Sequence, residues 1–573
     1  MVDCTVIRIV GRAGRLGYYI RRAKRALYIP FSCRREFVAM SRVYKSLPLI
    51  FFFVHITLAI HCNRKFREKP NDPLFARQWY LHNKKYPGED INWLPVYNAK
   101  ITGKGVHITI VGDGFDTEHP DLVQNGHSTS QARSTLGNSD HDHFVPKRNI
   151  GIHGTPMAGL VAAICNNGIG ICGAASGAEL LYNDLLLIPD GKKNGLQRLI
   201  TSIESDAAFS DISINSWGGE DFTGQYQSLD RSGSMQWQTA MENALKTGRN
   251  GKGTIFIWSA GNGTQVPYRE IDNSNYDEQT NFYGVMAVCA VDKKGMRASY
   301  SERGANLWVC APSSSAMGLN SDEMITTNVH TNRRLSNSVG STALPDQDYT
   351  SRFGGTSAAA ALVGGVVALM LEVNPDLTWR DVKIILAESA RKNDPNDSEW
   401  QFNGGQKIIK ENSKETRYHI SEKYGFGAVD AEKAVSLARK WVNVPSLVIY
   451  ETKQTYADHK IYASDFQSSV EIHYSGIYFI EYVDIFISSK MVDSGSMTIS
   501  LISPSGTKSV LQGPHDCLKN LKKVPCVIPS KWRYGSARQL GESPNGVWQL
   551  MVANASNPGS IYVKNWSMKI YGH

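Results

Sequence analysis

Apolar runs rich in β-branched residues recur along the first two thirds of the chain and predict buried strands. These runs cover residues 106–112, 211–217, 254–260 and 284–291. Segments with helical periodicity alternate with or follow them and cover residues 153–166, 234–248, 357–373 and 378–391. Strands that alternate with helices are typical of a parallel sheet with helices on both faces, so this part of the chain is predicted to have an α/β fold.

The pattern changes near residue 444. Short alternating runs such as GSMTISLISPSG and GVWQLMVAN follow, separated by Gly, Pro, Asn and Ser, and helical periodicity is lost. This texture is typical of an all-β sandwich or barrel. We therefore expect an α/β domain over residues 63–443 and a separate β-rich domain over residues 444–573.

An apolar run over residues 47–60 follows a basic stretch that starts at Met40. It is short for a membrane span and resembles the core of a signal peptide, which predicts such a segment over residues 40–62. A signal anchor is the alternative. Residues 1–39 would then be a basic extension, with Met40 as the initiator or with residues 1–39 belonging to another transcript form. We see no second apolar run of membrane length.

Charge is concentrated in the same N-terminal region. The formal net charge is +9, yet residues 1–70 hold 15 Lys and Arg against 3 Asp and Glu, whereas the remaining residues hold 47 against 50. The folded part is therefore slightly acidic, and we expect no nucleic-acid partner. Nine cysteines show no C-x-x-C spacing, which argues against a zinc site. The spacing of Cys517 and Cys526 allows a disulfide, and Cys289 is expected to be a small buried core residue.

Three segments carry side chains for nucleophilic catalysis in the order acid, His, Ser. They are ITIVGDGFDTEHPDL, GIHGTPMAGLVAA and FGGTSAAAALVGGVVALMLEVNP. Ser357 falls where a Gly-Gly-Thr loop becomes a helix, and His153 opens another helix. A Ser hydroxyl becomes a strong nucleophile when an imidazole removes its proton, and the imidazole needs an acid to fix its tautomer. Asn262, at the end of the strand in IFIWSAGNG, can donate to the oxyanion of a tetrahedral intermediate.

These segments, together with NDPLFARQWYL, YGFGAVDAEKAV and the C-terminal LISPSGTKSVL and WSMKIYGH, resemble the kexin/furin proprotein convertases of the subtilisin-like superfamily. The resemblance covers about residues 71–573. It implies a subtilisin-like parallel sheet of seven strands with helices on both faces, followed by a P domain that forms a jelly-roll-like β-barrel. It also implies a calcium-dependent, monomeric serine endoprotease of the secretory pathway, without a stable transmembrane segment, that cuts precursor proteins after Arg or Lys.

The resemblance also implies roles for particular residues. Ser357 would be the nucleophile, His153 the general base and Asn262 the oxyanion donor. The segment that pairs with the substrate backbone would be Ser216, Trp217 and Gly218. Asp277 would lie at the base of the primary specificity pocket and select a basic side chain.

Two calcium sites are implied in the same way, with oxygen ligands that suit Ca²⁺. The first would use the side chains of Asp72, Asp121 and Asn167 with the carbonyls of Ile164, Ile169 and Ile171. The second would use Asp221, Asp272 and Glu302.

The sequence departs from the family pattern at four places. The segment before His153 is neutral, the third calcium loop is not visible in GNSDHDHFVPKRN, and the usual prodomain does not fit between residues 61 and 71. At the fourth place, Gly112 occupies the position of the catalytic Asp. Asp113 is the nearest substitute, but successive side chains of a strand point to opposite faces. Asp113 is therefore expected to point away from His153 unless Gly112 and Gly114 allow a local bulge.

Three interpretations follow. The first is an endoprotease that cleaves after basic residues. The second is a catalytically impaired pseudoprotease that binds basic peptides, which Gly112 favours. The third is an incorrect gene model, which the unusual N-terminal region favours.

Overall fold

The computed structural model describes residues 4–10, 55–61, 69–123, 152–183, 185–186, 195–229, 231–265, 269–317, 324–328, 348–408, 416–461, 466–491, 494–520, 522–554 and 561–573. The chain divides into two compact units, Met1–Lys69 and Pro70–His573. In the first unit, β1 (Cys4–Val10) pairs antiparallel with β2 (His55–His61). Of the predicted signal-peptide-like segment only residues 55–61 are described, so that segment stays a prediction. Residues 137–149, the segment in which the third calcium loop of the family is not visible, lie outside the described residues.

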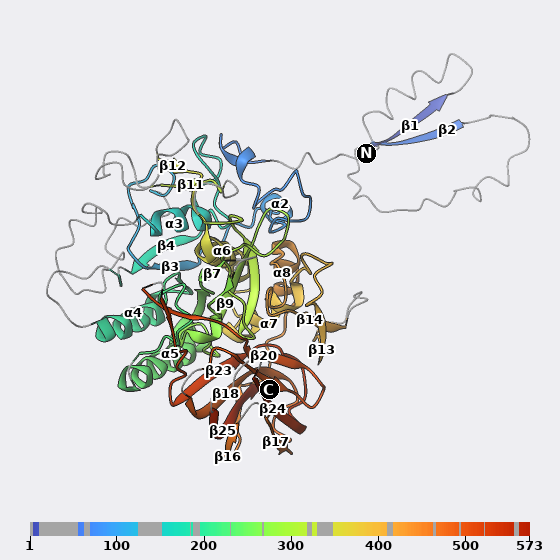
Figure 1. Ribbon diagram of the computed structural model, residues 1–573. Helices are drawn as coiled ribbons and strands as arrows, with labels where there is room; N and C mark the ends of the chain where they lie inside the picture. Colours follow the sequence, from blue (N-terminus) through green and yellow to red (C-terminus); the bar gives the residue numbers. More distant parts are fainter. Residues whose placement is uncertain are drawn as a thin grey trace, which may run out of the picture. The chain divides into compact units, whose positions relative to one another are not determined.

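A parallel sheet forms the centre of the larger unit (Figure 1). Its strand order is β10-β9-β6-β5-β3-β4, and every pairing in it is parallel. The strands are β3 (His107–Val111), β4 (Glu179–Asn183), β5 (Ile212–Asn215), β6 (Ile255–Ser259), β9 (Val285–Val291) and β10 (Leu307–Pro312). The described sheet therefore has six strands, one fewer than the resemblance implies, while its parallel topology is confirmed.

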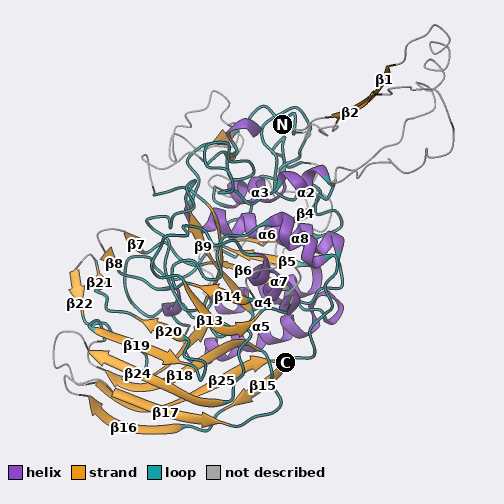
Figure 2. Ribbon diagram, turned by 90° about the vertical axis from the view of Figure 1, so that its right-hand side faces the viewer, coloured by secondary structure: helices purple, strands orange, loops and turns teal. Residues whose placement is uncertain are grey.

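Helices cover both faces of this sheet (Figure 2). They are α2 (Leu94–Asn98), α3 (Gly154–Ala162), α4 (Gly195–Phe209), α5 (Arg231–Gly251), α6 (Gly355–Val373), α7 (Trp379–Ser389) and α8 (Ala431–Ala438). An added Cβ at Gly364 of α6 would lie 2.3 Å from Ile214, whereas the next side chain toward the N-terminus, Ser213, bonds Asp206 of α4. Neighbouring residues of β5 thus face α6 and α4, which places these helices on opposite faces.

Helix α6 lies in the hydrophobic core. It is the one helix among the described residues that is long and apolar enough to cross a membrane, with 19 residues and a mean hydropathy of 1.8. The expectation that no second apolar run reaches membrane length is therefore wrong for this segment. Its residues from Gly355 to Leu371 are buried. A helix that is apolar on all sides is typical of a protein core as well as of a membrane span, and here it is packed against the sheet.

Small two-stranded sheets lie in the loops of the α/β domain. They are β7 (Thr264–Gln265) with β8 (Arg269–Glu270), β11 (Thr326–Thr327) with β12 (Tyr349–Thr350), and β13 (Gln401–Gln406) with β14 (Arg417–Ile420).

The C-terminal domain consists of antiparallel sheets around a second core. One sheet contains β15 (Val448–Glu451), β16 (Thr455–Ile461), β18 (Ile480–Met491), β23 (Lys531–Ser536) and β25 (Ile561–Gly572). The other contains β17 (Phe466–Ile472), β19 (Met497–Ile502), β20 (Lys508–Gln512) and β24 (Gly546–Asn554), and a small hairpin joins β21 (Cys517–Lys519) to β22 (Lys522–Val524). Buried side chains from both large sheets, including Ile485 and Trp548, form one cluster. The expected all-β domain is confirmed.

A buried ion cluster joins the two domains. Arg380 of α7 donates from Nε to Glu481 Oε2 at 2.8 Å and from Nη1 to the carbonyl of Pro445 at 2.7 Å. His573 Nδ1 lies 2.8 Å from Glu481 Oε1. Burial of Glu481 favours its neutral form, but the bonds from Arg380 and His573 outweigh it and hold the pKa of Glu481 below its usual value.

Three disulfides connect described cysteines. Cys517–Cys526 forms as the spacing allowed. Cys289 is fully buried, as expected, but it is paired with Cys310 of the neighbouring strand and is not an isolated core thiol. Cys165–Cys172 closes a short loop after α3.

Candidate active site

The carboxyl ends of the central strands place the predicted residues at one edge of the sheet, where α/β proteins bind ligands. Strand β3 ends directly before Gly112 and Asp113, β5 ends before Ser216, and β6 ends three residues before Asn262. The first turns of α3 and α6 supply the other two groups. His153 is the residue before α3, and Ser357 lies in the first turn of α6.

Ser357 and His153 are in direct contact. The Oγ atom of Ser357 lies 3.0 Å from Nε2 of His153. Burial lowers the pKa of His153, while the charge of Asp113 acts in the opposite direction. A neutral imidazole at hydrogen-bonding distance is what a general base for a serine hydroxyl requires. The backbone at Gly355 has φ +73°, a conformation that favours glycine, and it turns the loop into the start of α6.

Asp113 approaches His153 through the main chain. Its two carboxylate oxygens accept hydrogen bonds from the N–H groups of His153 at 3.0 Å and Gly154 at 2.8 Å. Among the described residues no hydrogen bond joins Asp113 to the imidazole ring. The carboxylate therefore caps the start of α3, where an anion is favourable. Asp113 thus contacts the main chain of His153 and not its imidazole ring.

Gly112, which the resemblance places at the position of the catalytic Asp, leaves space at its side-chain position. Its N–H donates to the carbonyl of Asn183 at 2.9 Å, and its own carbonyl accepts from Leu186 at 2.9 Å. An added Cβ would have no heavy atom within 4 Å. The backbone of Gly112 is thus held by hydrogen bonds, and there is free space where a side chain would lie.

Asn262 is held by the loop that carries the serine. Its Oδ1 atom accepts from the N–H of Thr356 at 2.8 Å and from the hydroxyl of Thr356 at 3.0 Å. Its own N–H donates to Asp221 at 3.0 Å, and its side chain also hydrogen-bonds that carboxylate. These bonds fix Asn262 beside the start of α6.

A cavity of about 140 Å³ lies next to these groups, with Ser216, Trp217 and Gly218 in its wall. Asp277 also lines it and accepts hydrogen bonds from the N–H groups of Gly219 at 3.1 Å and Gln279 at 2.8 Å. Burial raises the pKa of Asp277 to about 6, although these two bonds oppose the shift. A basic ligand side chain in the cavity would supply the missing countercharge.

The residues of the first implied calcium site gather around the loop closed by Cys165–Cys172. Asp121 accepts from Asn167 Nδ2 at 2.7 Å and from the N–H of Ile171 at 2.9 Å. Burial and then the nearby charge of Asp72 raise the pKa of Asp121 to about 6, against its hydrogen bonds. One oxygen of Asp72 is buried with no hydrogen-bond partner among the described residues. Two buried carboxylates, one with an orphan oxygen, fit a hard cation.

Two carbonyl groups of that implied site belong to the same loop. The N–H of Ile164 donates to the carbonyl of Asp121 at 2.9 Å, and the N–H of Ile169 donates to Asn167 Oδ1 at 3.0 Å. These bonds place Ile164 next to the main chain of Asp121 and Ile169 next to the side chain of Asn167. The sequence signal that could have pointed to the closure of this loop is the pair of cysteines that bracket it.

The second implied site is a cluster of three acids. Carboxylate oxygens of Asp221, Asp272 and Glu302 lie within 4.8 Å of one another. Burial and then its acidic neighbours raise the pKa of Glu302, and burial raises that of Asp272 to about 7. Carboxylates that share a buried position repel one another unless a cation joins them, so this oxygen-only set fits Ca²⁺.

Two glycines allow this cluster to form beside Asn262. An added Cβ at Gly261 would lie 2.2 Å from Glu302, and one at Gly263 would lie 1.7 Å from Asp272. The acids are therefore packed directly against the loop that carries Asn262.

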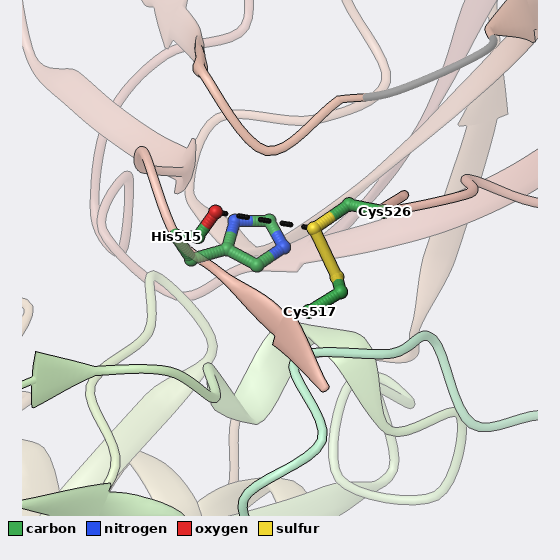
Figure 3. A group of neighbouring side chains, drawn as sticks. All are labelled: His515, Cys517 and Cys526. Carbon is green, nitrogen blue, oxygen red and sulfur yellow. Dashed lines mark hydrogen bonds between the residues drawn. A yellow bond between two sulfur atoms is a disulfide. The ribbon is translucent and has the colours of Figure 1, made fainter. Parts of the chain in front are cut away.

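The C-terminal domain contacts this region through the hairpin of β21 and β22 (Figure 3). His515 packs on Tyr276, a residue of the cavity wall, with ring centroids 4.8 Å apart and Nδ1 3.1 Å from the tyrosine hydroxyl. The N–H of Leu518 donates to the carbonyl of Thr223 at 2.7 Å. Sequence reasoning missed this contact, because no local pattern reports which loop of another domain a hairpin meets.

His515, Cys517 and Cys526 lie close enough together for a metal ion. Both sulfur atoms are joined in the disulfide, as Figure 3 shows, so they are not available as thiolate ligands. These residues form a disulfide-linked hairpin and not a metal centre.

Family models match most of the described chain. Residues 103–427 match the model described as Subtilase family, and residues 480–570 match the Proprotein convertase P-domain. Among solved structures, a serine protease of Aeromonas sobria superimposes with a TM-score of 0.74 at 23% identity, over 88% of this chain and 96% of that one. This similarity shows a shared fold.

Curated relatives give the same picture. Furin-like protease 2 of Drosophila melanogaster is 30% identical over 540 residues, which cover 90% of this chain and 29% of that protein. PC3-like endoprotease variant B of Hydra vulgaris is 30% identical over 508 residues, covering 86% of this chain and 64% of the relative. Proprotein convertase subtilisin/kexin type 7 of Mus musculus is 28% identical, with coverages of 88% and 61%. The chain thus spans less than two thirds of each of these relatives.

Proposed function

The chain belongs to the subtilase family and carries a proprotein convertase P-domain, and on this premise we propose that it is a serine endoprotease that cuts precursor proteins after basic residues. The observation that carries the proposal is the contact of 3.0 Å between Ser357 Oγ and His153 Nε2 beside a cavity that holds Asp277.

In the proposed mechanism, His153 takes the proton of Ser357 as the hydroxyl attacks the scissile carbonyl. The bond between the serine and the carbonyl carbon forms as the carbonyl becomes an oxyanion. Asn262, beside the start of α6, would donate the second hydrogen of its side-chain amide to that oxyanion, and the N-terminal end of the helix favours the same charge. His153 then returns the proton to the leaving amine, and water releases the acyl group by the same steps in reverse order.

Substrate selection in this proposal rests on Asp277. A guanidinium or ammonium group in the cavity would pair with its carboxylate, and its charge would oppose the burial that raises the pKa of Asp277 to about 6. Ser216, Trp217 and Gly218 would pair with the substrate backbone as an added strand.

Calcium would hold the loops around this pocket in place. Asp221, Asp272 and Glu302 would bind one ion, and Asp72, Asp121 and Asn167 would contribute to another, together with the carbonyls of Ile164, Ile169 and Ile171. The support is the mutual proximity of buried carboxylates in both places. The ion supplies positive charge and fixes the acids; it takes no part in bond cleavage.

We place this activity in the secretory pathway. The support is the presence of three disulfides between described cysteines, which persist in oxidising compartments. The proposed partners are precursor proteins with basic cleavage sites, and the enzyme would act as a monomer.

A second candidate function is that of a pseudoprotease that binds basic peptides. The observation that favours it is Gly112, together with the use of both Asp113 oxygens on main-chain N–H groups. Purified protein incubated with a fluorogenic peptide that ends in Arg separates the two. Release of the fluorophore that disappears in Ser357→Ala supports the protease, whereas tight binding without release supports the pseudoprotease.

A further inference from the structure

A layer of polar side chains is buried between the sheet and α4. Parallel strands covered on both faces are usually apolar. Here hydrogen-bonding side chains from three strands and from α4 meet, and none is more than 3% exposed: Thr109, Asn183, Ser202, Asp206, Ser213 and Asn215. Nothing in the proposed chemistry uses them.

Four residues of this region form a continuous series of hydrogen bonds. Residues 213, 215 and 217 point to the same side of an extended segment, because side chains alternate along it. The Ser213 hydroxyl donates to Asp206 Oδ2 at 2.6 Å, and Asn215 Nδ2 donates to Ser213 Oγ at 2.9 Å. The indole Nε1 of Trp217 donates to Asn215 Oδ1 at 3.0 Å. We call Asp206, Ser213, Asn215 and Trp217 the relay.

The direction of every bond in the relay is fixed. An indole nitrogen can only donate, so Asn215 must turn its oxygen to Trp217 and its amino group to Ser213. The Ser213 oxygen then accepts, and its proton must go to an acceptor on the other side. Asp206 is that acceptor, which explains why a carboxyl group stands at the end of the series.

Burying the carboxyl group of Asp206 is energetically unfavourable. Burial raises the pKa of Asp206 to about 7, although its bonds with Ser213, Asn183 and Thr109 oppose the shift. A polar group buried in a core is expensive unless it is fully hydrogen-bonded. An apolar residue of similar size would avoid that cost but would leave the relay without its final acceptor.

The other end of the relay is part of the substrate cleft. Trp217 lines the cavity that holds Asp277. Its carbonyl accepts from Trp258 Nε1 at 2.7 Å, and the two indole rings meet edge to face with centroids 4.9 Å apart. The indole of Trp217 is therefore fixed by two groups, Trp258 on one side and Asn215 on the other.

We propose that the relay positions the Trp217 indole and thereby sets how tightly the cleft binds a substrate peptide. This inference rests on the proposed function, because it assumes that a peptide occupies the cleft. None of the four residues contacts Ser357 or His153 through a hydrogen bond described above, and those two lie on other elements. Loss of the relay should thus weaken binding, because the wall must be ordered when the peptide arrives, and leave the chemical step nearly unchanged.

Binding is measured on the Ser357→Ala background with a fluorescein-labelled peptide that carries Arg before the bond to be cut. Ser213→Ala cuts the relay in the middle and should raise the Kd about five- to tenfold, the equivalent of one lost buried hydrogen bond. Ser213→Thr keeps the hydroxyl and should restore binding. The matched control is Ser202→Ala, which removes a hydroxyl from the same buried layer that bonds Asn183 and not the relay.

Coupling between the ends gives a sharper test. Trp217→Phe keeps an aromatic ring and removes only the donor of the relay. If the relay acts as a unit, Ser213→Ala combined with Trp217→Phe should weaken binding no more than the stronger single change. Additive effects, or an equal effect of Ser202→Ala, would overturn the proposal. In the active enzyme Ser213→Ala should raise KM and leave kcat within about twofold.

A readout without substrate separates this inference from the proposed function. In protein labelled with ¹⁵N-tryptophan, the indole signal that is lost in Trp217→Phe belongs to Trp217. Its hydrogen exchange should become at least about tenfold faster in Ser213→Ala and stay unchanged in Ser202→Ala. Unchanged exchange in Ser213→Ala refutes the relay. Faster exchange with an unchanged Kd in Ser213→Ala would keep the relay as a structural device and refute its role in substrate affinity. Equal binding of Arg and Leu peptides would refute the proposed specificity and leave the relay standing.

Discussion

Replacing Gly112 by Asp restores a carboxyl group at the end of β3, beside the candidate histidine. The backbone should accept it. Gly112 is not among the described glycines with positive φ, and an added Cβ meets no heavy atom within 4 Å. The hydrogen bonds of Gly112 to Asn183 and Leu186 involve only its main chain, so they survive the substitution.

The size of the effect follows from what His153 lacks. Its Nε2 atom faces Ser357, while both oxygens of Asp113 bond main-chain N–H groups. Without an acid on the ring, the imidazole can adopt the wrong tautomer and its cation is poorly supported in the transition state. In subtilisin, loss of this acid alone costs about 3 × 10⁴ in kcat, equivalent to about 6 kcal/mol. Because the charge of Asp113 already acts on His153, we expect Gly112→Asp to recover about a thousandfold or more.

The assay is the turnover of a fluorogenic peptide that ends in Arg, with Ser357→Ala as the blank. Gly112→Asn is the matched control, because it adds nearly the same volume without the charge and should give a far smaller gain. Binding of the same peptide to each variant shows that the pocket is intact.

Two results would refute the reasoning. If the wild type already turns over as fast as Gly112→Asp and Asp113→Asn abolishes activity, then Asp113 serves as the triad acid. The argument from its main-chain bonds would then be wrong. If Gly112→Asp binds the peptide but stays inert, the defect lies beyond the triad and the pseudoprotease function is favoured.

The remaining predictions concern the pocket, the ions and the domain contacts. Asp277→Asn should leave a bound guanidinium unpaired and weaken kcat/KM for Arg peptides by about 2–5 kcal/mol, and an unchanged preference for Arg over Leu would exclude Asp277 as the selector. Chelation of calcium should lower the Tm measured by calorimetry and abolish peptide binding, because Asp221, Asp272 and Glu302 then repel one another; an unchanged Tm would contradict both ion sites. Arg380→Leu should destabilise the protein by about 3–5 kcal/mol, since buried Glu481 then keeps only His573 as a partner. Because the folded pKa of Glu481 is depressed, its contribution should be present above about pH 4.3, the unfolded value, and lost as the pH falls through the folded pKa; denaturant titrations of wild type and Arg380→Leu should converge in acid. The double change Cys517→Ser and Cys526→Ser should loosen the hairpin against Tyr276 and raise KM for Arg peptides, whereas an unchanged KM would separate the C-terminal domain from the pocket.

The sequence predicted those elements whose burial is uniform. Strands β3, β5, β6 and β9 consist of nearly continuous apolar runs, and helices α3, α5, α6 and α7 fall within or close to their expected ranges. Strand β4 has the sequence ELLYN and α4 has the sequence GLQRLITSIESDAAF. Their polar residues interrupt the hydrophobic pattern, so that pattern did not predict these two elements. Three of those polar residues, Asn183, Ser202 and Asp206, belong to the buried layer. A pattern that assigns polar residues to the surface and apolar residues to the core therefore failed there.

Those parts of the candidate site whose residues stand within a short sequence motif could be predicted. The contact of His153 with Ser357 followed from residue types at the starts of two helices. The bonds of Asp113 to the main chain of His153 and Gly154 depend on how the loop after β3 bends. The alternation of side chains along a strand does not predict that bend. Cys289–Cys310 required the order of the strands, because its partners become neighbours only when β9 and β10 pair.

The anchoring of Asn262 has a consequence for the synthesis of the protein. Asn262, Gly263 and Thr264 form an N-x-T triplet, which is an acceptor for N-linked glycans in a chain that enters the secretory pathway. In the folded protein the side chain of Asn262 is bonded to Thr356, so a glycan could be attached only before the loop closes. A glycan on Nδ2 of Asn262 would replace one hydrogen of the side-chain amide proposed to bind the oxyanion and would place a bulky group at that position. If the chain enters the secretory pathway as proposed, folding and glycosylation compete for one side chain. Peptide mapping of the purified protein would show what fraction of molecules carries an unmodified Asn262.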